Sequence, residues 1–295
     1  MAESLLRLDG ITKDFYGATV LSGVNFSLDK GEILGLVGEN GAGKTTLMHI
    51  LFGMSDIIET GGYGGRVYIE GQPVTFKSPF DALDAGIGMV HQEFSLIPGF
   101  TACENIMLNR EPTAYNPAIE LFGERLATIK RAQMREHSAQ ALAKLGVNIS
   151  ADTVVSEMPV AHKQFTEIAR EISRSQVKLL VLDEPTAVLT ESEADILLAS
   201  LKRLASEGIA IVFISHRLHE VTAISDRILV LRDGQMIRDV PNENVSVQNI
   251  TEWMVGREVS QRTDKEDDSR DFAGEAFRAE HLWVDMPGET VRDAT

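Results

Sequence analysis

The segment Gly38–Thr45, which reads GENGAGKT, constrains this chain more than any other feature because it separates two predicted elements of regular structure. The apolar run Glu32–Val37 before it predicts a strand, and Thr45–Phe52 after it predicts a helix. The segment matches G-x-x-x-x-G-K-[ST], a loop whose glycines let backbone N–H groups surround phosphates at a helix N-terminus. Lys44 is expected to reach the β- and γ-phosphates of a nucleotide, and the Thr45 hydroxyl is expected to ligate Mg²⁺. The residues predicted to contact the nucleotide here are Gly38, Glu39, Asn40, Gly41, Ala42, Gly43, Lys44, Thr45 and Thr46.

Two adjacent acidic residues, Asp183 and Glu184, end an apolar run that begins at Lys178. Such a run is typical of a strand buried in a parallel sheet, and the ends of these strands deliver side chains to the crevice where the sheet binds ligands. Asp183 suits a direct or water-mediated Mg²⁺ contact, and Glu184 suits orienting or deprotonating an attacking water. The alternative is that the pair initiates a helix, since Pro185 suits an early helical position. The phosphate loop elsewhere in the chain favours the catalytic interpretation.

His216 follows a second buried-strand pattern, Ile209–Ser215. A histidine at the end of such a strand is placed to contact the γ-phosphate and to hold the water. A lone histidine is more often structural, so both interpretations stay open on this pattern alone.

Alternating strand and helix patterns predict an α/β fold, with a mostly parallel sheet and helices on both faces. From about Gln92 to Val160 the pattern is mainly helical, which predicts a helical subdomain inserted into the α/β core. Asp233-Gly234 is a hairpin signal. The other predicted elements are strands at Leu5–Leu8, Val24–Leu28, Val67–Ile69, Arg227–Leu231 and Gln235–Arg238, and helices at Ala132–Leu145 and Ser192–Ala205.

The composition narrows the classes of function. A net charge of −16 argues against a protein that coats nucleic acid, so no nucleic-acid partner is expected. The single cysteine, Cys103, fits a reducing compartment. No secretory signal precedes the first strand, and no apolar stretch approaches the roughly 18 residues needed to span a bilayer. Any membrane association is therefore expected to come through a partner.

These residues together resemble the ATP-binding cassette of ABC transporters over about Leu5–Val255. Within that superfamily the chain is most similar to the tandem-cassette ATPases of bacterial simple-sugar importers (ribose, galactose, arabinose, xylose and inositol types). The similarity rests on the stretches GENGAGKTTLM, GMVHQE, LDEPTAVLT, IVFISHRLHEV, LRDGQ and MVGRE. The resemblance implies a P-loop NTPase core of the ABC-ATPase type, with an antiparallel β subdomain and an inserted helical subdomain.

The resemblance also implies roles for individual residues. Tyr16 matches the aromatic residue that stacks on adenine, with a core tyrosine as the alternative. Gln92 matches the glutamine that touches Mg²⁺ and the water, and His216 matches the switch histidine. The implied cofactors are ATP and Mg²⁺, with Thr45, Gln92 and Asp183 at the metal and Lys44, Gln92, Glu184 and His216 in catalysis.

Two positions depart from the family pattern. The signature L-S-G-G-Q aligns with Met158–His162, where Pro159 replaces the key serine and offers neither a hydroxyl nor a backbone N–H. Thr190 stands where an aspartate is usual. Family cassettes pair head to tail around ATP, so the resemblance implies one active site built on Lys44, Glu184 and His216, and one impaired site.

The predicted domains are a cassette over residues 1–258, an acidic linker over 259–275, and the start of a second, truncated cassette over 276–295. The last of these rests on Ala276–Val284, which resembles Leu5–Ile11. A disordered tail is the alternative.

The implied function is an ATPase that powers import of a monosaccharide-like solute at the cytoplasmic face of the inner membrane. Its implied partners are permease subunits, a second cassette and, indirectly, a periplasmic or extracellular solute-binding protein. Alternatives are a nucleoside or signalling-furanose importer, a non-transport cassette ATPase of translation or DNA repair, and a regulatory nucleotide-binding module without turnover.

Overall fold

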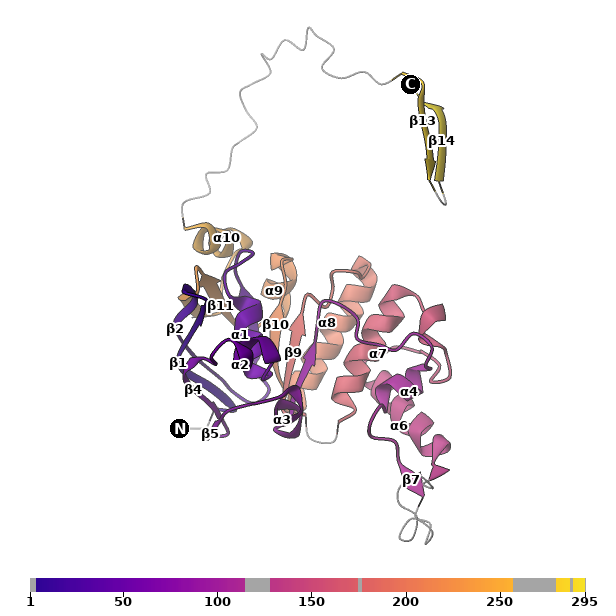
Figure 1. Cartoon of the computed structure of the whole chain (residues 1–295), viewed down its shortest axis with the longest axis horizontal. Coiled ribbons are helices and arrows are strands. Elements are labelled where there is room, and N and C mark those ends of the chain that lie inside the picture. Colours follow the sequence, from indigo (N-terminus) through magenta and orange to yellow (C-terminus); the bar gives the residue numbers. More distant parts are fainter. Residues whose placement is uncertain (1–3, 115–127, 175–176, 257–279, 287–288, 295) are drawn as a thin grey trace. The chain divides into compact units, whose positions relative to one another are not determined.

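The computed structural model describes residues 4–114, 128–174, 177–256, 280–286 and 289–294 (Figure 1). The chain divides into two compact units, Met1–Arg257 and Glu258–Thr295. The predicted linker over 259–275 lies outside the described residues.

A six-stranded sheet forms the centre of the first unit, in the order β12-β11-β3-β10-β9-β6. Strands β3, β10, β9, β6 and β11 pair in parallel, and only the β11–β12 pair of this sheet is antiparallel. The turn between β11 and β12 contains Asp233-Gly234, which confirms the predicted hairpin. The strands are β3 (Ile33–Val37), β6 (Ile87–Val90), β9 (Leu179–Asp183), β10 (Ala210–Ile214), β11 (Arg227–Arg232) and β12 (Gln235–Pro241).

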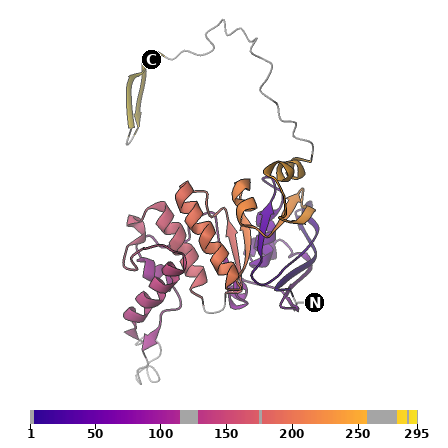
Figure 2. The same cartoon turned by 180° about the vertical axis from the view of Figure 1, so that it is seen from behind.

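Both faces of the central part of this sheet are covered, which explains why β3 and β10 are buried and apolar along their whole length. In β9, Leu180 and Leu182 belong to one hydrophobic core, and Leu179 and Val181 belong to the other. The core that contains Leu179 and Val181 also contains residues of α1 (Lys44–Leu51). The core that contains Leu180 and Leu182 contains residues of α8 (Glu191–Ser206), which covers the opposite face of the sheet (Figure 2). The predicted α/β class is confirmed.

A four-stranded antiparallel sheet in the order β2-β1-β4-β5 packs into the same core as α1. Lys13 of β1 is buried there, and its ammonium donates hydrogen bonds to the Gly62 carbonyl at 2.6 Å and to the Thr60 hydroxyl at 2.7 Å. The strands are β1 (Leu6–Phe15), β2 (Ala18–Leu28), β4 (Gly64–Ile69) and β5 (Gln72–Val74), and the short helices α2 (Ser55–Glu59) and α3 (Pro79–Asp84) lie along this part of the chain.

The helices α4 (Ala102–Ile106), α6 (Arg131–Lys144) and α7 (Val160–Ile172) pack on one another beside the sheet (Figure 1). The helix predicted at Ala132–Leu145 matches α6, which buries Met134, Ala141 and Leu142 as its apolar spacing requires. The helical part of the chain continues to Ile172. Short elements complete this region: β7 (Thr113–Ala114), β8 (Thr128–Ile129) and a 3₁₀ turn at Val155–Glu157.

The last elements of the first unit are α9 (Leu218–Ile224) and α10 (Val247–Val255). The second unit contains an antiparallel pair, β13 (Leu282–Met286) and β14 (Glu289–Ala294). Among the helices that the structure describes, none is long and apolar enough to cross a membrane.

Candidate functional site

The predicted phosphate loop connects β3 to α1 and is held in a conformation that requires glycine. Gly43, the residue before α1, has φ of 102°, and a Cβ atom there would lie 2.6 Å from Cδ2 of Leu21. A Cβ atom at Gly38 would collide with the carbonyl oxygen of Leu231. The loop therefore packs against its surroundings through bare backbone, and its residues Asn40, Gly41 and Gly43 line a cavity in front of α1.

Lys44 is the first residue of α1, and its ammonium group folds back over the loop. Nζ donates hydrogen bonds to the carbonyl oxygens of Gly38 at 2.7 Å and Glu39 at 3.1 Å. Burial lowers the pKa of Lys44, while the nearby charges of Glu184 and Asp183 oppose that shift. A partly buried ammonium whose hydrogen bonds, within the described part of the chain, go to carbonyl oxygens is prepared to bind an anion.

One cavity of about 340 Å³ brings most of the predicted site residues together. Larger cavities of about 430 and 490 Å³ occur elsewhere, but none of the predicted site residues lines them. Of the predicted residues, Gly38, Glu39, Ala42 and Tyr16 do not line the 340 Å³ cavity. Its walls are Val20, Asn40, Gly41, Gly43, Lys44, Thr45, Thr46, Gln92, Asp183, Glu184 and His216.

Glu184 and His216 leave the neighbouring strands β9 and β10 and meet at the cavity. Glu184 has a positive φ of 51°, and its N–H donates to the Ile214 carbonyl at 2.9 Å. Its Oε2 accepts a hydrogen bond from the backbone N–H of His216 at 3.2 Å, and Nε2 of His216 lies 3.4 Å from Oε1. Within the described residues Oε1 is buried without a hydrogen-bond partner, and burial raises the pKa of Glu184. This carboxylate is suited to accept a proton.

Asp183 ends β9 beside Glu184. Burial raises its pKa, and the charge of Lys44 opposes that shift. Two neighbouring acids whose charges are disfavoured by burial would be stabilised by a cation. Thr45, Gln92 and Asp183 line the same cavity and supply the oxygen donors that Mg²⁺ prefers. Within the described ranges no group of three or more His, Cys, Asp and Glu side chains is arranged to hold a metal ion.

Tyr16 lies outside the cavity, in the turn between β1 and β2. Its φ is 50° and its side chain is 96% exposed, so the alternative of a core tyrosine is wrong. Val20 of the following strand lines the cavity, which places the turn near its edge. The stacking role of Tyr16 stays a prediction.

A family model described as ABC transporter matches residues 21–187. The chain belongs to the ABC transporter family. It is 44% identical over 257 residues to the ribose import ATP-binding protein RbsA of Hahella chejuensis, covering 87% of this chain and 48% of that protein. It is 41% identical over 281 residues to the glucose import ATP-binding protein TsgD13 of Haloferax volcanii, covering 90% of this chain and 50% of that protein. The chain therefore spans about half the length of the curated relatives it matches.

Solved cassettes share the fold. A crystal structure of the ADP conformation of MJ1267, an ATP-binding cassette of an ABC transporter, superimposes with a TM-score of 0.70 at 26% identity, covering 86% of this chain and 99% of that one. A nucleotide-free cassette from an ABC transporter gives a TM-score of 0.68 at 27% identity, covering 81% of this chain and 92% of that one.

The two departures from the cassette pattern have structural counterparts at helix N-termini. Pro159 is the residue before α7, and its φ of −53° lies within the range that the proline ring fixes. Thr190 precedes α8 and forms a capping box with Glu193, whose Oε2 accepts from the Thr190 hydroxyl at 2.7 Å and from its N–H at 2.9 Å. Thr190 thus stabilises the start of α8 where the cassette pattern has an aspartate.

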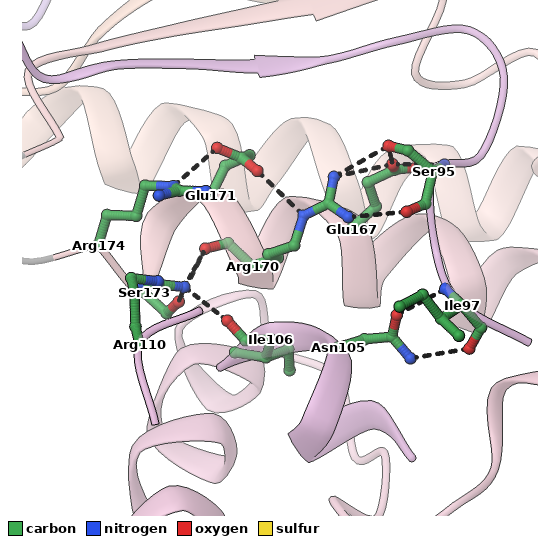
Figure 3. A network of polar contacts seen from close by, with 10 residues as sticks. All are labelled: Ser95, Ile97, Asn105, Ile106, Arg110, Glu167, Arg170, Glu171, Ser173 and Arg174. Carbon is green, nitrogen blue, oxygen red and sulfur yellow. Dashed lines mark hydrogen bonds and ion pairs between the residues drawn. The ribbon is translucent and has the colours of Figure 1, made fainter. Parts of the chain in front are cut away.

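A polar network that the sequence did not predict ties the segment after Gln92 to α7 of this cassette (Figure 3). Oε1 of Glu167, whose side chain is fully buried, accepts from the Ser95 N–H at 2.9 Å and from the Ser95 hydroxyl at 2.6 Å. Arg170 donates to Glu167 Oε1 and to the Ser95 carbonyl, each at 3.1 Å. The i,i+3 pair Glu167/Arg170 on an amphipathic helix was the available signal, but such pairs are usually exposed.

The same network continues to the end of α7 through charged side chains (Figure 3). Glu171 accepts from Arg170 and Arg174, each at 3.1 Å. Arg110 donates to the carbonyls of Ile106 at the end of α4 and Arg170 in the last turn of α7. The network therefore fixes the position of the segment that carries Gln92 relative to the helical part.

Proposed function

We propose that this chain binds Mg·ATP in the cavity beside Lys44 and hydrolyses it. The proposal depends on one observation: an ammonium, two acids with raised pKa values and a histidine surround a single cavity beside a glycine loop. This arrangement matches the requirements of phosphoryl transfer, which needs charge neutralisation and a positioned water more than covalent chemistry.

Each residue has a proposed role. Lys44 exchanges its two carbonyl partners for phosphate oxygens, and the loop N–H groups from Gly38 to Thr46 bind the remaining phosphate oxygens. Thr45, Gln92 and Asp183 hold Mg²⁺, which when bound neutralises phosphate charge. Glu184 accepts the proton of the attacking water, and His216 holds the γ-phosphate and the water in place. Tyr16 stacks on adenine.

We further propose that ATP hydrolysis here powers import of a monosaccharide. The support is that relatives 40–44% identical to this chain are named for ribose or glucose import. In this role the chain binds permease subunits from the cytoplasmic side of the membrane, pairs with a second cassette, and receives solute indirectly through a solute-binding protein.

We infer that residues 276–295 begin a second cassette. The β13–β14 pairs Asp285↔Thr290 and Met286↔Glu289 repeat the β1–β2 pairs Asp14↔Thr19 and Phe15↔Ala18, each at the same place next to a two-residue connection. Positive φ also recurs four residues before each aspartate, at Gly10 (62°) and His281 (53°). This repetition favours a duplicated unit over an unrelated tail.

We propose that the paired cassettes have unequal sites. This half supplies Lys44, Glu184 and His216 to its own ATP, but Pro159 gives the opposite site a signature without a hydroxyl or N–H. The isolated chain is therefore expected to bind Mg·ATP and to turn it over slowly.

Calorimetric titration with Mg·ATP, combined with measurement of phosphate release, tests nucleotide binding and hydrolysis. Lys44→Ala is expected to weaken binding at least about tenfold, because charge-assisted hydrogen bonds to phosphate contribute roughly 1.5–3 kcal/mol. Lys202→Ala, an exposed lysine on α8, is the matched control. If Lys44→Ala binds as tightly as the parent, the proposed site is wrong.

Uptake of labelled ribose and glucose tests the transport role. Cells that carry the full-length protein with its permease are expected to accumulate one of these sugars, and Glu184→Gln is expected to abolish the uptake. Equal uptake with and without Glu184 would contradict the proposal.

A further inference from the structure

Glu220 is a buried residue next to the proposed nucleotide site. It belongs to the first turn of α9, its side chain is 3% exposed, and it does not line the nucleotide cavity. A buried carboxylate is costly unless it is hydrogen-bonded, so its partners indicate what it does there.

Its partners come from the two loops that carry the proposed catalytic side chains. Oε2 accepts from the Thr186 hydroxyl at 2.5 Å, and Thr186 is fully buried two residues after Glu184. The Ser215 hydroxyl, one residue before His216, lies 3.5 Å from the same oxygen and accepts the Arg217 N–H at 3.0 Å. Oε1 accepts from the Arg217 guanidinium at 3.2 Å.

The short Thr186 contact is in the range of a hydroxyl that donates to an ionised carboxylate, the stronger class of hydrogen bond. Arg217, which is 39% exposed, neutralises that charge from the solvent side. Stability alone gives no reason for this ion pair, because replacing buried ionic groups with apolar ones of similar size is often neutral or stabilising.

We propose that Glu220 is a positioning residue for the reaction. From the buried side, it fixes the loop that carries Glu184 relative to the loop that carries His216. Two further contacts join the same loops. The Glu184 N–H donates to the Ile214 carbonyl, and the His216 N–H donates to Glu184 Oε2. The Thr186–Glu220 bond is the side-chain counterpart of these contacts on the buried side. The inference depends on the proposed ATPase function.

The double variant Thr186→Val/Glu220→Met separates positioning from stability. It removes both groups of the Thr186–Glu220 bond and fills their volume. Arg217 is 39% exposed and the Ser215 hydroxyl keeps its bond to the Arg217 N–H, so the melting temperature is expected to stay close to that of the parent. Phosphate release is expected to fall at least about tenfold with Mg·ATP affinity unchanged within about twofold, since small misplacements of reacting groups cost up to 10² in rate. Thr186→Ser/Glu220→Gln, which keeps a hydroxyl beside a carbonyl oxygen, is expected to recover most of the lost turnover.

If the apolar double variant is as stable as the parent and releases phosphate as fast, the positioning role is overturned. If the parent itself releases no phosphate above the level of Glu184→Gln, the proposed hydrolysis fails instead. In that case the NMR resonances of the His216 ring, assigned with His216→Gln, still test the inference. They are expected to shift in the apolar double variant and to return in Thr186→Ser/Glu220→Gln, and unchanged resonances would overturn the positioning role.

Discussion

The backbone N–H of His216 donates a 3.2 Å hydrogen bond to Oε2 of Glu184, and this leaves Oε1 of the same carboxylate buried without a hydrogen-bond partner among the described residues. One oxygen therefore fixes the orientation of the group, and the other, which lies 3.4 Å from Nε2 of His216 without a hydrogen bond, is the one placed to accept a proton. This division of labour within one side chain gives the most direct test of the site.

Glu184→Gln is expected to lower phosphate release by about 10²–10⁴-fold while Mg·ATP still binds. The amide keeps the size of the side chain and can still accept the His216 N–H, but it cannot accept a proton from water. Measurement of phosphate release beside calorimetric affinity separates the two effects. Glu207→Gln, an exposed glutamate after α8, is the control and should change neither.

Asp183→Asn is expected to raise the melting temperature of the nucleotide-free chain by a few degrees near neutral pH. Burial raises the pKa of Asp183, so the folded state binds more protons than the unfolded state between the unfolded pKa and the raised folded pKa. Stability contributed by this group therefore falls as pH rises through that window. About 1 kcal/mol corresponds to roughly 2–4 °C for a chain of this size.

The gain from Asp183→Asn should be largest above the folded pKa and should shrink as the pH falls towards 3.8, the ordinary pKa of an aspartate. Thermal scans of parent and variant at about pH 8 and about pH 4 measure this, with the smaller gain expected at pH 4. A gain that is equal at both pH values would show that the carboxylate charge is not its cause. The same variant should bind Mg·ATP more weakly, which would separate stability from function.

Tyr16→Ala is expected to weaken ATP binding by about 1–3 kcal/mol, the range of stacking between an aromatic side chain and a base. Because the ring is 96% exposed, its removal should leave the free energy of unfolding nearly unchanged. Tyr16→Phe keeps the ring and should bind like the parent. Equal affinities for the alanine and phenylalanine variants would exclude stacking.

Glu167→Gln is expected to lower the free energy of unfolding by roughly 1–3 kcal/mol, since it removes the charge that pairs with Arg170 inside the protein. Ser95→Ala should cost less, about 1 kcal/mol, because only the hydroxyl bond is lost. Urea unfolding of both single variants and the double variant gives their coupling energy. If the two losses in unfolding free energy simply add in the double variant, the Ser95–Glu167 contact is contradicted. Glu136→Gln, on the exposed side of α6, is the control.

The central strands could be predicted because their chemistry is local. A strand buried on both faces forms a continuous apolar run, so β3, β10 and the first four residues of β9 stand out in the sequence. Parallel pairing, with Ile214 opposite Asp183, then places the residues that follow each strand at one edge of the sheet. The meeting of Lys44, Glu184 and His216 follows from that topology.

The supporting residues could not be predicted in the same way. Glu167 and Glu220 are acidic residues on short amphipathic helices, and such residues are usually exposed. Each is buried against a partner from a distant part of the chain, Ser95 for Glu167 and Thr186 for Glu220. Such a contact leaves no local pattern in the sequence. Likewise, β1 and β2 are longer than predicted. Their full length was missed because the Tyr16-Gly17 turn that joins them has no strong hairpin composition.

The repeated hairpin has a consequence for how two halves of one polypeptide would hold nucleotides. The two residues between β1 and β2 are Tyr16-Gly17, and the two between β13 and β14 are Pro287-Gly288. A pyrrolidine ring has no π face to offer a purine. If Tyr16 stacks on adenine as proposed, a nucleotide beside a hairpin with the second sequence would lack an aromatic platform, and duplication followed by divergence would have left one adenine site stronger than the other.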